Sequence, residues 1–418
     1  MNAQPDADVV VVGGGPAGLA AAVGVALMGR TAIVVDSGGD RGPGGRAVMM
    51  HSGTLRVLST MGCADAIVAE AATIDSMETR TPRHVLTTAR FTALPGPYPF
   101  AVTLLQARTE AILRARAQEL GVRLVTDRAM GVVQDHRGSA ALLEGGASLG
   151  GRYLVGADGM HGTVRRAAGI SYPDTGASSG DAENLTLADV VAPGYELRDR
   201  AIILTGPGGM LALVPLPQGR LRVVANLPEG HTAPTADSIQ SLIDTRWSPR
   251  RSDRPQISVD EVVASTHLRI RHHLADRFRA NRVLLAGDAG HVHSTAGGQG
   301  MNLGIRDGWY LARAIAGALD AEEAAQPDKA DALLDSYASN RRAVAARVID
   351  VTNRISRIMF PPAPFRPLVY LGVRLAERFG AGERQALALS GLLDTGPDML
   401  RSSSQHLLAE PSGQRGLA

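Results

Sequence analysis

A chain of 418 residues can form two or three domains with a large core, and its composition, 44% hydrophobic and 20% charged, is ordinary for a globular protein. The net charge is +2 and the charged residues are interspersed, which argues against a nucleic-acid-binding protein. Cys63 is the only cysteine and Lys329 the only lysine, so an internal disulfide, a multi-cysteine metal site and most lysine chemistry are excluded.

The uncharged stretch at residues 9–29 is long enough to cross a membrane. Several glycines and Pro16 interrupt it, however, and Asp6 and Asp8 stand where a signal peptide would carry positive charge. We therefore expect a cytoplasmic protein without an integral membrane segment.

The same stretch opens the first recognisable unit of the chain. An apolar strand is expected at Val9–Val12, followed by the run GGGPAG at Gly13–Gly18 and an alanine-rich helix that ends near Gly29. A second strand, Ala32–Val35, ends in Asp36. This order is typical of a dinucleotide-binding unit: a strand, the GxGxxG turn, a helix, and a second strand with an acidic residue at its end.

Each residue of this motif has an expected task. Gly13 permits the tight turn, Gly15 lets a pyrophosphate approach the backbone, and Gly18 lets the helix pack closely on the strand. Asp36 can accept hydrogen bonds from the ribose hydroxyls of an adenosine. The motif leaves open whether a nicotinamide or a flavin dinucleotide binds.

The following segments carry weaker signals. Arg46 comes after a glycine-rich turn and could either pair with a phosphate or lie on the surface. The segment Glu78–Phe100 lacks a helical period and is expected to be a strand excursion into a second lobe. Leu104–Leu120 has apolar residues at helical spacing, and Gln106 and Glu110 would share one face of that helix.

Two further apolar strands also end in an aspartate beside a glycine. The first leads into Asp158-Gly159, and the second, Val283–Ala286, leads into Gly287-Asp288. A loop with two histidines, a turn with three glycines and a helix from about Met301 follow. In doubly wound sheets, ligands bind beyond the carboxyl ends of the strands. Together with Asp36, these strand ends predict a site for one large, extended dinucleotide.

Short apolar and alternating stretches between the second and third strand ends predict an inserted β-rich lobe, and helical patterns dominate after Gly308. The predicted fold class is α/β: a Rossmann-like nucleotide-binding domain with an inserted β-sheet substrate domain and C-terminal helices. The nucleotide-binding domain is predicted at 1–75, 101–175 and 276–358, the inserted domain at 76–100 and 176–275, C-terminal helices at 359–400, and a disordered tail at 401–418.

The chain resembles the FAD-dependent aromatic hydroxylases with the para-hydroxybenzoate hydroxylase fold in three motifs taken together. These are GxGxxG with Asp36, then Asp158-Gly159, and then Gly287-Asp288 with GGQGMN. The resemblance covers roughly residues 8–357. It implies a single-component monooxygenase of secondary metabolism that binds FAD, takes up NAD(P)H transiently and transfers oxygen from a flavin C4a-hydroperoxide. The expected substrate is aromatic or polyketide-like, and the expected enzyme is a monomer or homodimer.

The resemblance also assigns residues to the two nucleotides. NAD(P)H would contact Arg46, Asp158 and Gly159. Contacts to FAD would come from Gly13, Gly15, Ala17, Gly18, Asp36, Gln106, Gly287, Asp288, Gly298, Gly300, Met301 and Asn302. The chain departs from the family pattern in two places, where Ser294-Thr295 replace prolines and Gly162 replaces a serine.

Two histidines are candidates for a base or proton relay, because a phenol reacts faster as its phenolate. His293 lies in the loop expected beside the flavin, and His51 precedes a helix. Each could instead order its loop through a hydrogen bond. No metal site is predicted.

Other functions need separate arguments. A flavin-dependent halogenase would need a reactive lysine and a Trp-x-Trp-x-Ile-Pro segment, which this chain lacks. A nicotinamide-dependent dehydrogenase would leave the motif at Gly287–Asn302 unexplained. Two alternatives stay open: a related flavoprotein that oxidises, epoxidises or reduces a non-aromatic substrate such as an isoprenoid, and a flavin-binding protein without turnover.

Overall fold

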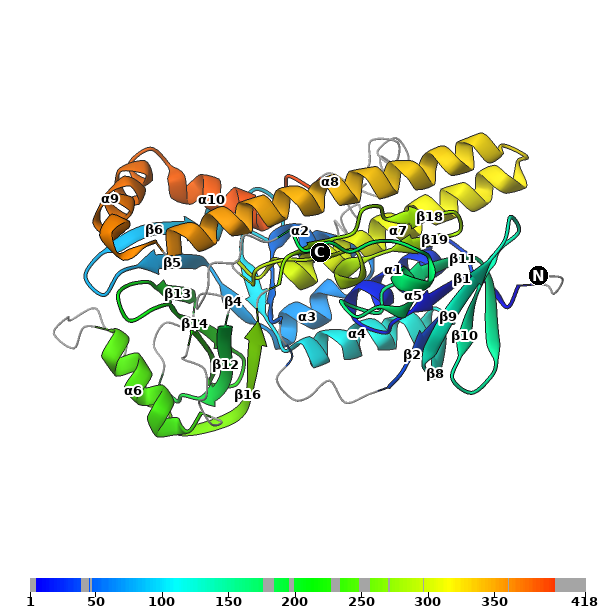
Figure 1. Ribbon diagram of the computed structural model, residues 1–418. Coiled ribbons are helices and arrows are strands. Elements are labelled where there is room, and N and C mark those ends of the chain that lie inside the picture. The colour runs from blue at the N-terminus through cyan, green and yellow to red at the C-terminus, as the bar shows by residue number, and fades with distance from the viewer. Residues whose placement is uncertain are drawn as a thin grey trace, which may run out of the picture.

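The computed structural model describes residues 5–38, 45, 47–175, 184–194, 199–226, 234–247, 256–269, 271–295, 297–359 and 361–394. Arg46 and the predicted tail at 401–418 lie outside these residues. The molecule is elongated, with one sheet near the N-terminus and a second sheet at the opposite end (Figure 1).

The first sheet has eight strands. Its centre is parallel, in the order β19 (Val283–Leu285), β11 (Ser148–Gly156), β1 (Ala7–Val12), β2 (Ala32–Asp36) and β8 (Arg123–Thr126). Antiparallel strands β18 (Arg279–Ala280), β10 (Ser139–Leu143) and β9 (Ala129–Gln134) extend it. Because the central strands run in the same direction, the three acidic strand ends predicted from the sequence lie along one edge of this sheet.

Helix α1 (Pro16–Leu27) lies between this sheet and α7 (Gln299–Glu323), and α4 (Gln106–Glu119) packs beside it. Glycines let α1 and α7 approach each other closely. A Cβ atom on Gly308 would lie 2.4 Å from the Ala17 carbonyl oxygen, and one on Gly24 would lie 2.6 Å from Ala312 Cβ. Both distances are shorter than van der Waals contact, so a larger residue at either place would push the helices apart.

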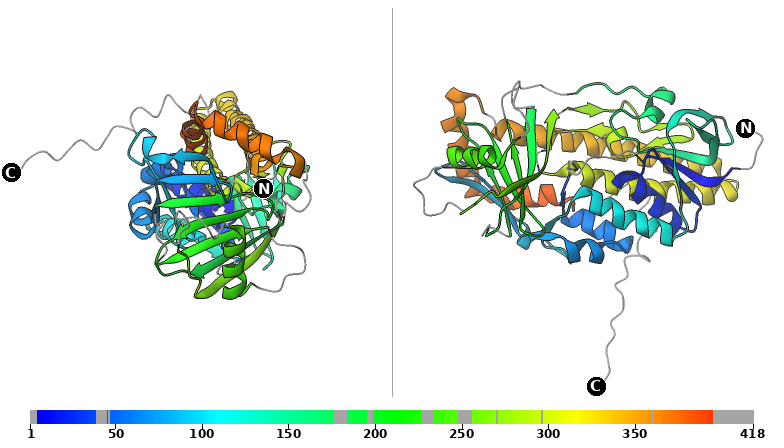
Figure 2. Two further views of the ribbon diagram at one scale, coloured as in Figure 1. Left: turned by 90° about the vertical axis from the view of Figure 1, so that its left-hand side faces the viewer. Right: turned by 90° about the horizontal axis from the view of Figure 1, so that it is seen from below.

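The second sheet has seven strands, in the order β16 (Glu261–Arg269), β12 (Asn184–Val191), β15 (Arg220–Ala225), β14 (Leu211–Leu216), β13 (Arg200–Leu204), β5 (Ser76–Arg80) and β6 (Val85–Arg90). The early segment 76–90 thus joins strands more than 100 residues later, through the parallel pairing of β5 with β13. Helix α6 (Ala236–Arg246) and Trp247 cover one face, and the other face looks toward the first sheet (Figure 2).

Small elements connect the two sheets. Strands β3 (Met49–Met50), β7 (Ala101–Thr103) and β4 (Ala72–Ile74) form one small sheet, and β17 (His273–Leu274) pairs with β20 (His291–Val292). Helices α2 (Ser52–Thr60), α3 (Ala64–Glu70) and α5 (Thr163–Ala167) and the 3₁₀ turns at Phe91–Ala93 and Gly287–Ala289 fill the remaining connections.

The C-terminal part of the described chain is helical. Helix α8 (Pro327–Met359) runs along the molecule from the first sheet to the second, and α9 (Arg366–Glu377) and α10 (Ala381–Ser390) turn back over β6 (Figure 1). A 3₁₀ turn at Ala363–Phe365 precedes α9. Among the described residues, no helix is long and apolar enough to cross a membrane. The predicted α/β fold class is confirmed.

Candidate active site

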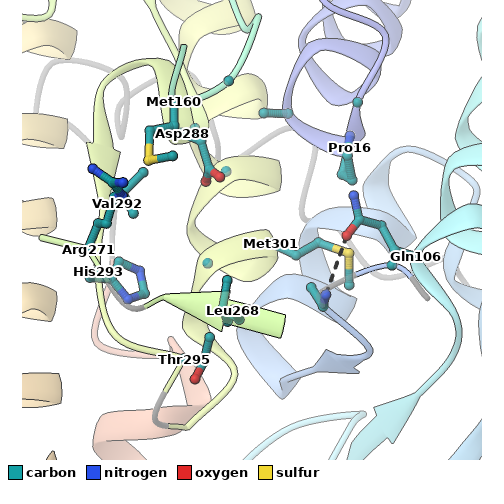
Figure 3. A pocket seen from close by; sticks show the side chains of 18 of the residues that line it. Pro16, Gln106, Met160, Leu268, Arg271, Asp288, Val292, His293, Thr295 and Met301 are labelled. Carbon is teal, nitrogen blue, oxygen red and sulfur yellow. Dashed lines mark hydrogen bonds between the residues drawn. The ribbon is translucent and has the colours of Figure 1, made fainter. Parts of the chain in front are cut away.

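One continuous cavity of about 1530 Å³ connects the first glycine-rich turn to the second sheet. Gly13 and Asp36 line one end, Gly298 and Met301 line the middle, and Ile203 lies on the sheet wall at the other end. Figure 3 shows side chains from both parts of the molecule pointing into this space, with Pro16 and Gln106 opposite Asp288 and His293. The shape suits a long ligand with a second molecule beside one end.

The first glycine-rich turn has the geometry that the motif predicts. Gly13 has φ +109°, and a Cβ atom there would lie 2.3 Å from the Ala157 carbonyl oxygen. A Cβ atom on Gly18 would lie 1.9 Å from the Gly13 carbonyl oxygen, so Gly18 is a packing residue and is absent from the cavity lining. Gly15, Ala17 and Asp36 do line the cavity.

The second strand end contributes Asp158 and Gly159 to the cavity. Asp158 Oδ2 accepts a hydrogen bond of 2.9 Å from the Val164 amide, while Oδ1 is buried without a hydrogen-bond partner among the described residues. Burial raises the pKa of this carboxyl group. A Cβ atom on Gly162 would lie 2.4 Å from Asp158 Oδ1, so the departure to glycine at this position makes room for the carboxylate.

The third strand end is Gly287-Asp288. Gly287 has φ +62° and would place a Cβ atom 2.8 Å from Ala17 Cβ, so glycine lets this turn contact α1. Asp288 lines the cavity and points into it (Figure 3). A carboxylate at this place can accept hydrogen bonds from a polyol chain.

A buried ionic cluster, Asp307, His291 and Arg341, holds this turn from behind. Asp307 Oδ2 accepts from the Gly287 amide at 3.1 Å and lies 2.6 Å from His291 Nε2, while Oδ1 lies 2.7 Å from Arg341 Nε. All three side chains are fully buried. Burial alone would raise the pKa of Asp307, but Arg341 and His291 keep this pKa below its ordinary value. The sequence did not indicate this cluster.

The glycine-rich loop before α7 is held by Asn302 and His51. Asn302 Nδ2 donates to the carbonyl oxygens of Met49 at 2.8 Å and Gly298 at 2.7 Å, and its Oδ1 accepts from the His51 amide at 2.9 Å. His51 Nε2 lies 2.8 Å from the Gly297 carbonyl oxygen and therefore donates to it. Neither Asn302 nor His51 lines the cavity, whereas Gly298, Gly300 and Met301 do.

His293 is placed differently from His51, because it lines the cavity. Its Nδ1 lies 2.8 Å from the Ser294 carbonyl oxygen and must donate to it, which leaves Nε2 as an acceptor in the neutral ring. Burial, followed by the nearby His291, lowers the pKa of His293 to about 4. Nε2 is buried and has no hydrogen-bond partner among the described residues. The ring points toward the middle of the cavity (Figure 3).

Gln106 and its predicted neighbour lie as expected on α4. Gln106 lines the cavity, and its Nε2 donates to Glu110 Oε1 at 2.9 Å. Its Oε1 accepts from the Ala47 amide at 3.4 Å. The amide of Gln106 is thereby fixed at the cavity wall opposite Asp288 (Figure 3).

The second sheet supplies an apolar wall. The stretches at residues 210–215 and 221–226 contribute Met210, Ala212, Val214 and Val224. Strands β12, β13, β5 and β16 add six more apolar residues: Leu185, Leu187, Ala201, Ile203, Met77 and Leu268. The wall contains one buried ion pair, in which Arg222 Nε and Nη2 donate to Asp189 at 2.7 and 2.8 Å.

Stability is expected to decrease as the pH falls from about 6.5 to about 4. Burial lowers the pKa of both His51 and His293 to about 4, whereas each returns to about 6.5 in the unfolded chain. Between these pH values the unfolded chain binds more protons than the folded protein. The free energy of unfolding therefore decreases as the pH is lowered, by up to about 3 kcal/mol for each histidine. Urea unfolding at pH 7 and pH 5 measures the slope. The variant His293→Gln should flatten it, and an unchanged slope would contradict the assignment.

The chain matches a family model described as an FAD binding domain over residues 6–352. A flavin-dependent monooxygenase from Mycobacteroides abscessus is 32% identical over 96% of this chain and 88% of its own length. A 6-methylpretetramide 4-monooxygenase from Streptomyces rimosus is 31% identical over 85% of this chain, which spans 63% of that relative.

Solved structures agree on the fold. The crystal structure of p-nitrophenol 4-monooxygenase from Pseudomonas putida aligns with a TM-score of 0.77, covering 93% of this chain and 100% of that chain at 24% identity. The family match extends over all three strand ends that line the cavity. The chain therefore belongs to the FAD-binding family and is a FAD-dependent monooxygenase with the para-hydroxybenzoate hydroxylase fold.

Proposed function

We propose that FAD lies along the strand ends of the cavity and that an aromatic or polyketide-like substrate binds against the apolar wall of the second sheet. The enzyme then hydroxylates this substrate with NAD(P)H and O2. The observation that carries the proposal is the single cavity, which joins the dinucleotide turn to the apolar wall through the glycine-rich loop. When bound and reduced, FAD supplies the activation of O2, and the protein supplies binding, orientation and exclusion of water.

The cavity geometry supports specific contacts. The turn from Gly13 to Ala17 would carry the pyrophosphate, and Asp36 the adenosine ribose. Asp288 and Gln106 face each other across the cavity and would hold the ribityl chain (Figure 3). The backbone of Gly298, Gly300 and Met301 would contact the flavin ring, because the glycines leave room for a flat ligand.

The remaining predicted contacts divide into two kinds. Gly18, Gly287 and Asn302 act by holding the backbone in place, as their packing and hydrogen bonds indicate. Asp158 and Gly159 line the same cavity and are proposed as transient contacts for NAD(P)H. Arg46, proposed for the same task, lies outside the described residues.

Of the two histidine candidates, His293 is the one positioned to meet a substrate. Its ring lines the cavity, and its unprotonated Nε2 is buried without a hydrogen-bond partner among the described residues, so it can accept a hydrogen bond. A neutral phenol supplies such a donor, and the same nitrogen can take up the phenolic proton as the ring carbon is attacked. His51 is proposed to order the glycine-rich loop instead.

The substrate class rests on the apolar wall and on the family. The wall offers ten apolar side chains and one ion pair, with polar residues of the edge strand β16 beside them, which suits a flat, largely apolar ring system. The relative from Streptomyces rimosus is named for a polyketide-derived substrate, 6-methylpretetramide. We propose a cytoplasmic enzyme, monomeric or homodimeric, that acts on a phenolic ring of this kind.

Replacing His293 by phenylalanine is expected to lower kcat/KM for hydroxylation by about 100-fold, within the range of general acid-base contributions. Flavin content should stay unchanged, and His293→Gln, which retains an acceptor, should recover part of the rate. The assay measures ¹⁸O incorporation from ¹⁸O2 into a panel of phenols and aromatic polyketides, alongside NAD(P)H consumption. His136→Phe, which removes an exposed histidine, is the matched control.

This assay tests the hydroxylase function and the role of His293 separately. Labelled product from the wild type supports the hydroxylase function, and unlabelled oxidation of a non-aromatic substrate would contradict it. If wild type and His293→Phe form labelled product at equal rates, the role of His293 is wrong while the function stands.

A further inference from the structure

Helix α9 lies at the end of the molecule that carries the second sheet, away from the nucleotide-binding sheet (Figures 1 and 2). It packs on β6 and on the start of α10. The helix spans Arg366–Glu377, and none of its residues is fully buried. Its contacts with the protein show which side of the helix faces inward, and its exposed side chains show what the other side could bind.

Several hydrogen bonds hold α9 on the protein. Glu377 Oε2 accepts from Thr87 Oγ1 at 2.7 Å and from the Gly382 amide at 2.9 Å, and Oε1 accepts from the Thr88 amide at 3.2 Å. Tyr370 Oη lies 3.2 Å from Thr205 Oγ1. The face of α9 that carries Tyr370 and Glu377 is thus its inner face.

The outer face is apolar. Phe365, Leu368, Leu371, Leu375 and Phe379 are 59%, 70%, 53%, 46% and 76% exposed. Leu368, Leu371 and Leu375 lie along one side of α9 at helical spacing, and Phe365 and Phe379 flank the helix at its two ends. A surface helix of a globular protein ordinarily exposes its polar side. In α9 the half-buried inner side already carries apolar residues, among them Val369 and Val373, so the exposed apolar residues form a second apolar side. We call these five side chains the α9 stripe.

The α9 stripe is larger than isolated exposed residues would be. Five side chains at these exposures present on the order of 500 Å² of apolar surface. Contiguous patches of this size on a monomer are often functional, yet each partner of a standard protein interface buries about 800 Å². The stripe alone therefore falls short of a stable dimer interface.

The charges beside the α9 stripe indicate which kind of partner could bind it. Arg374 and Arg378 lie beside the stripe, both are exposed, and neither has an ion pair within the described part of the chain. Glu377 is the only acidic residue of α9, and its carboxylate is bonded inward. A second copy of α9 would bring two more unpaired arginines and no free carboxylate to pair with them. The charge of this surface therefore favours an anionic partner.

We propose that α9 binds an anionic lipid surface. The stripe would insert at the boundary between headgroups and acyl chains, with the helix axis in the membrane plane. The Arg374 and Arg378 side chains are long enough to reach lipid phosphates from this position. An apolar stripe flanked by arginines is the pattern of helices that lie on a membrane without crossing it.

The test is flotation of the full-length holoenzyme with vesicles of phosphatidylcholine alone and of phosphatidylcholine with 30 mol% phosphatidylglycerol, roughly the anionic content for which headgroup attraction is significant. The wild type should float with the anionic vesicles and lose binding in high salt. Arg374→Gln with Arg378→Gln should lower the partition coefficient about 30-fold, from about 1 kcal/mol for each arginine.

The apolar contribution has its own variant and control. Leu368→Ser with Leu371→Ser should lower binding at least about tenfold, because two apolar side chains no longer enter the interface. Val133→Ser removes a 43% exposed apolar residue from β9 and should bind like the wild type. Flavin content, measured in parallel, should be equal in all four proteins, since α9 contributes no residue to the cavity.

Three results would overturn the proposal. The first is absence of flotation with anionic vesicles, and the second is flotation that the leucine and arginine variants leave unchanged. The third is a wild-type dimer that the leucine variant converts to a monomer without any vesicle binding, which would show that a second copy covers the stripe.

Discussion

Replacing Asp307 by asparagine is expected to lower the free energy of unfolding by about 3–5 kcal/mol and to release FAD. Asp307 is fully buried and pairs with Arg341 through one oxygen and with His291 and the Gly287 amide through the other. Arg341 would keep its second buried carboxylate, Asp394, at 2.6 Å, but the cluster would lose one of its two negative charges, and breaking a buried ion pair is strongly destabilising. Asparagine has a single acceptor oxygen, so it cannot accept from Arg341 on one side and from the Gly287 amide on the other, and the hold on the Gly287-Asp288 turn would weaken.

Asp335→Asn is the matched control, because Asp335 also pairs with an arginine, Arg279, but its side chain is 69% exposed. Exposed pairs contribute about 1 kcal/mol or less. Denaturant unfolding with and without added FAD, together with the flavin-to-protein ratio after gel filtration, measures both variants. Equal destabilisation of the two proteins would show that the buried cluster has no special role.

The substitution Gly13→Ala is expected to abolish FAD retention and to destabilise the first sheet. A Cβ atom at this position would lie 2.3 Å from the Ala157 carbonyl oxygen and 2.6 Å from its carbon, both of which belong to the backbone. The backbone after β1 or after β11 must therefore move, and the turn that would carry the pyrophosphate moves with it.

Gly29→Ala separates this clash from backbone strain. Gly29 also has a positive φ, +75°, but a Cβ atom there would meet no atom within 4 Å. The left-handed conformation alone should cost roughly 1–2 kcal/mol and leave FAD binding intact. The flavin absorbance of both purified variants gives the comparison, and a Gly13→Ala protein with full flavin would refute the steric argument.

The strand ends could be predicted from the sequence because each is encoded locally. A buried strand, a glycine and an aspartate stand within a few residues of one another at Asp36, Asp158 and Asp288. Parallel pairing then brings them to one edge without any further information. The family, the fold class, FAD and the monooxygenase class, all inferred from these motifs by resemblance, are confirmed by the comparisons.

Features that depend on distant residues could not be predicted in the same way. Asp307 meets His291 and Arg341, which are 16 and 34 residues away, and nothing in the local sequence selects these pairs. The same limit applies to the two histidines. His51 and His293 look alike in the sequence, but Asn302 and Gly297 enclose the first whereas the second faces the cavity.

Helix α9 shows a related limit of periodicity. The spacing of its apolar residues predicts an amphipathic helix, and the ordinary expectation is that the apolar side packs inward. The hydrogen bonds of Glu377 and Tyr370 turn another side of the helix inward and leave the stripe exposed, and they involve threonines about 290 and 165 residues earlier. Only the tertiary structure shows which side of α9 is free.

The most direct test of the central claim is anaerobic stopped-flow reduction of the bound flavin by NADPH, followed near 450 nm (roughly where oxidised flavin absorbs), with and without a panel of phenols and aromatic polyketides. We expect a yellow protein whose flavin is reduced slowly alone and much faster with one class of phenolic ligand, because that ligand occupies the wall of the second sheet. A colourless protein after reconstitution with FAD, or reduction that no ligand changes, would contradict the account.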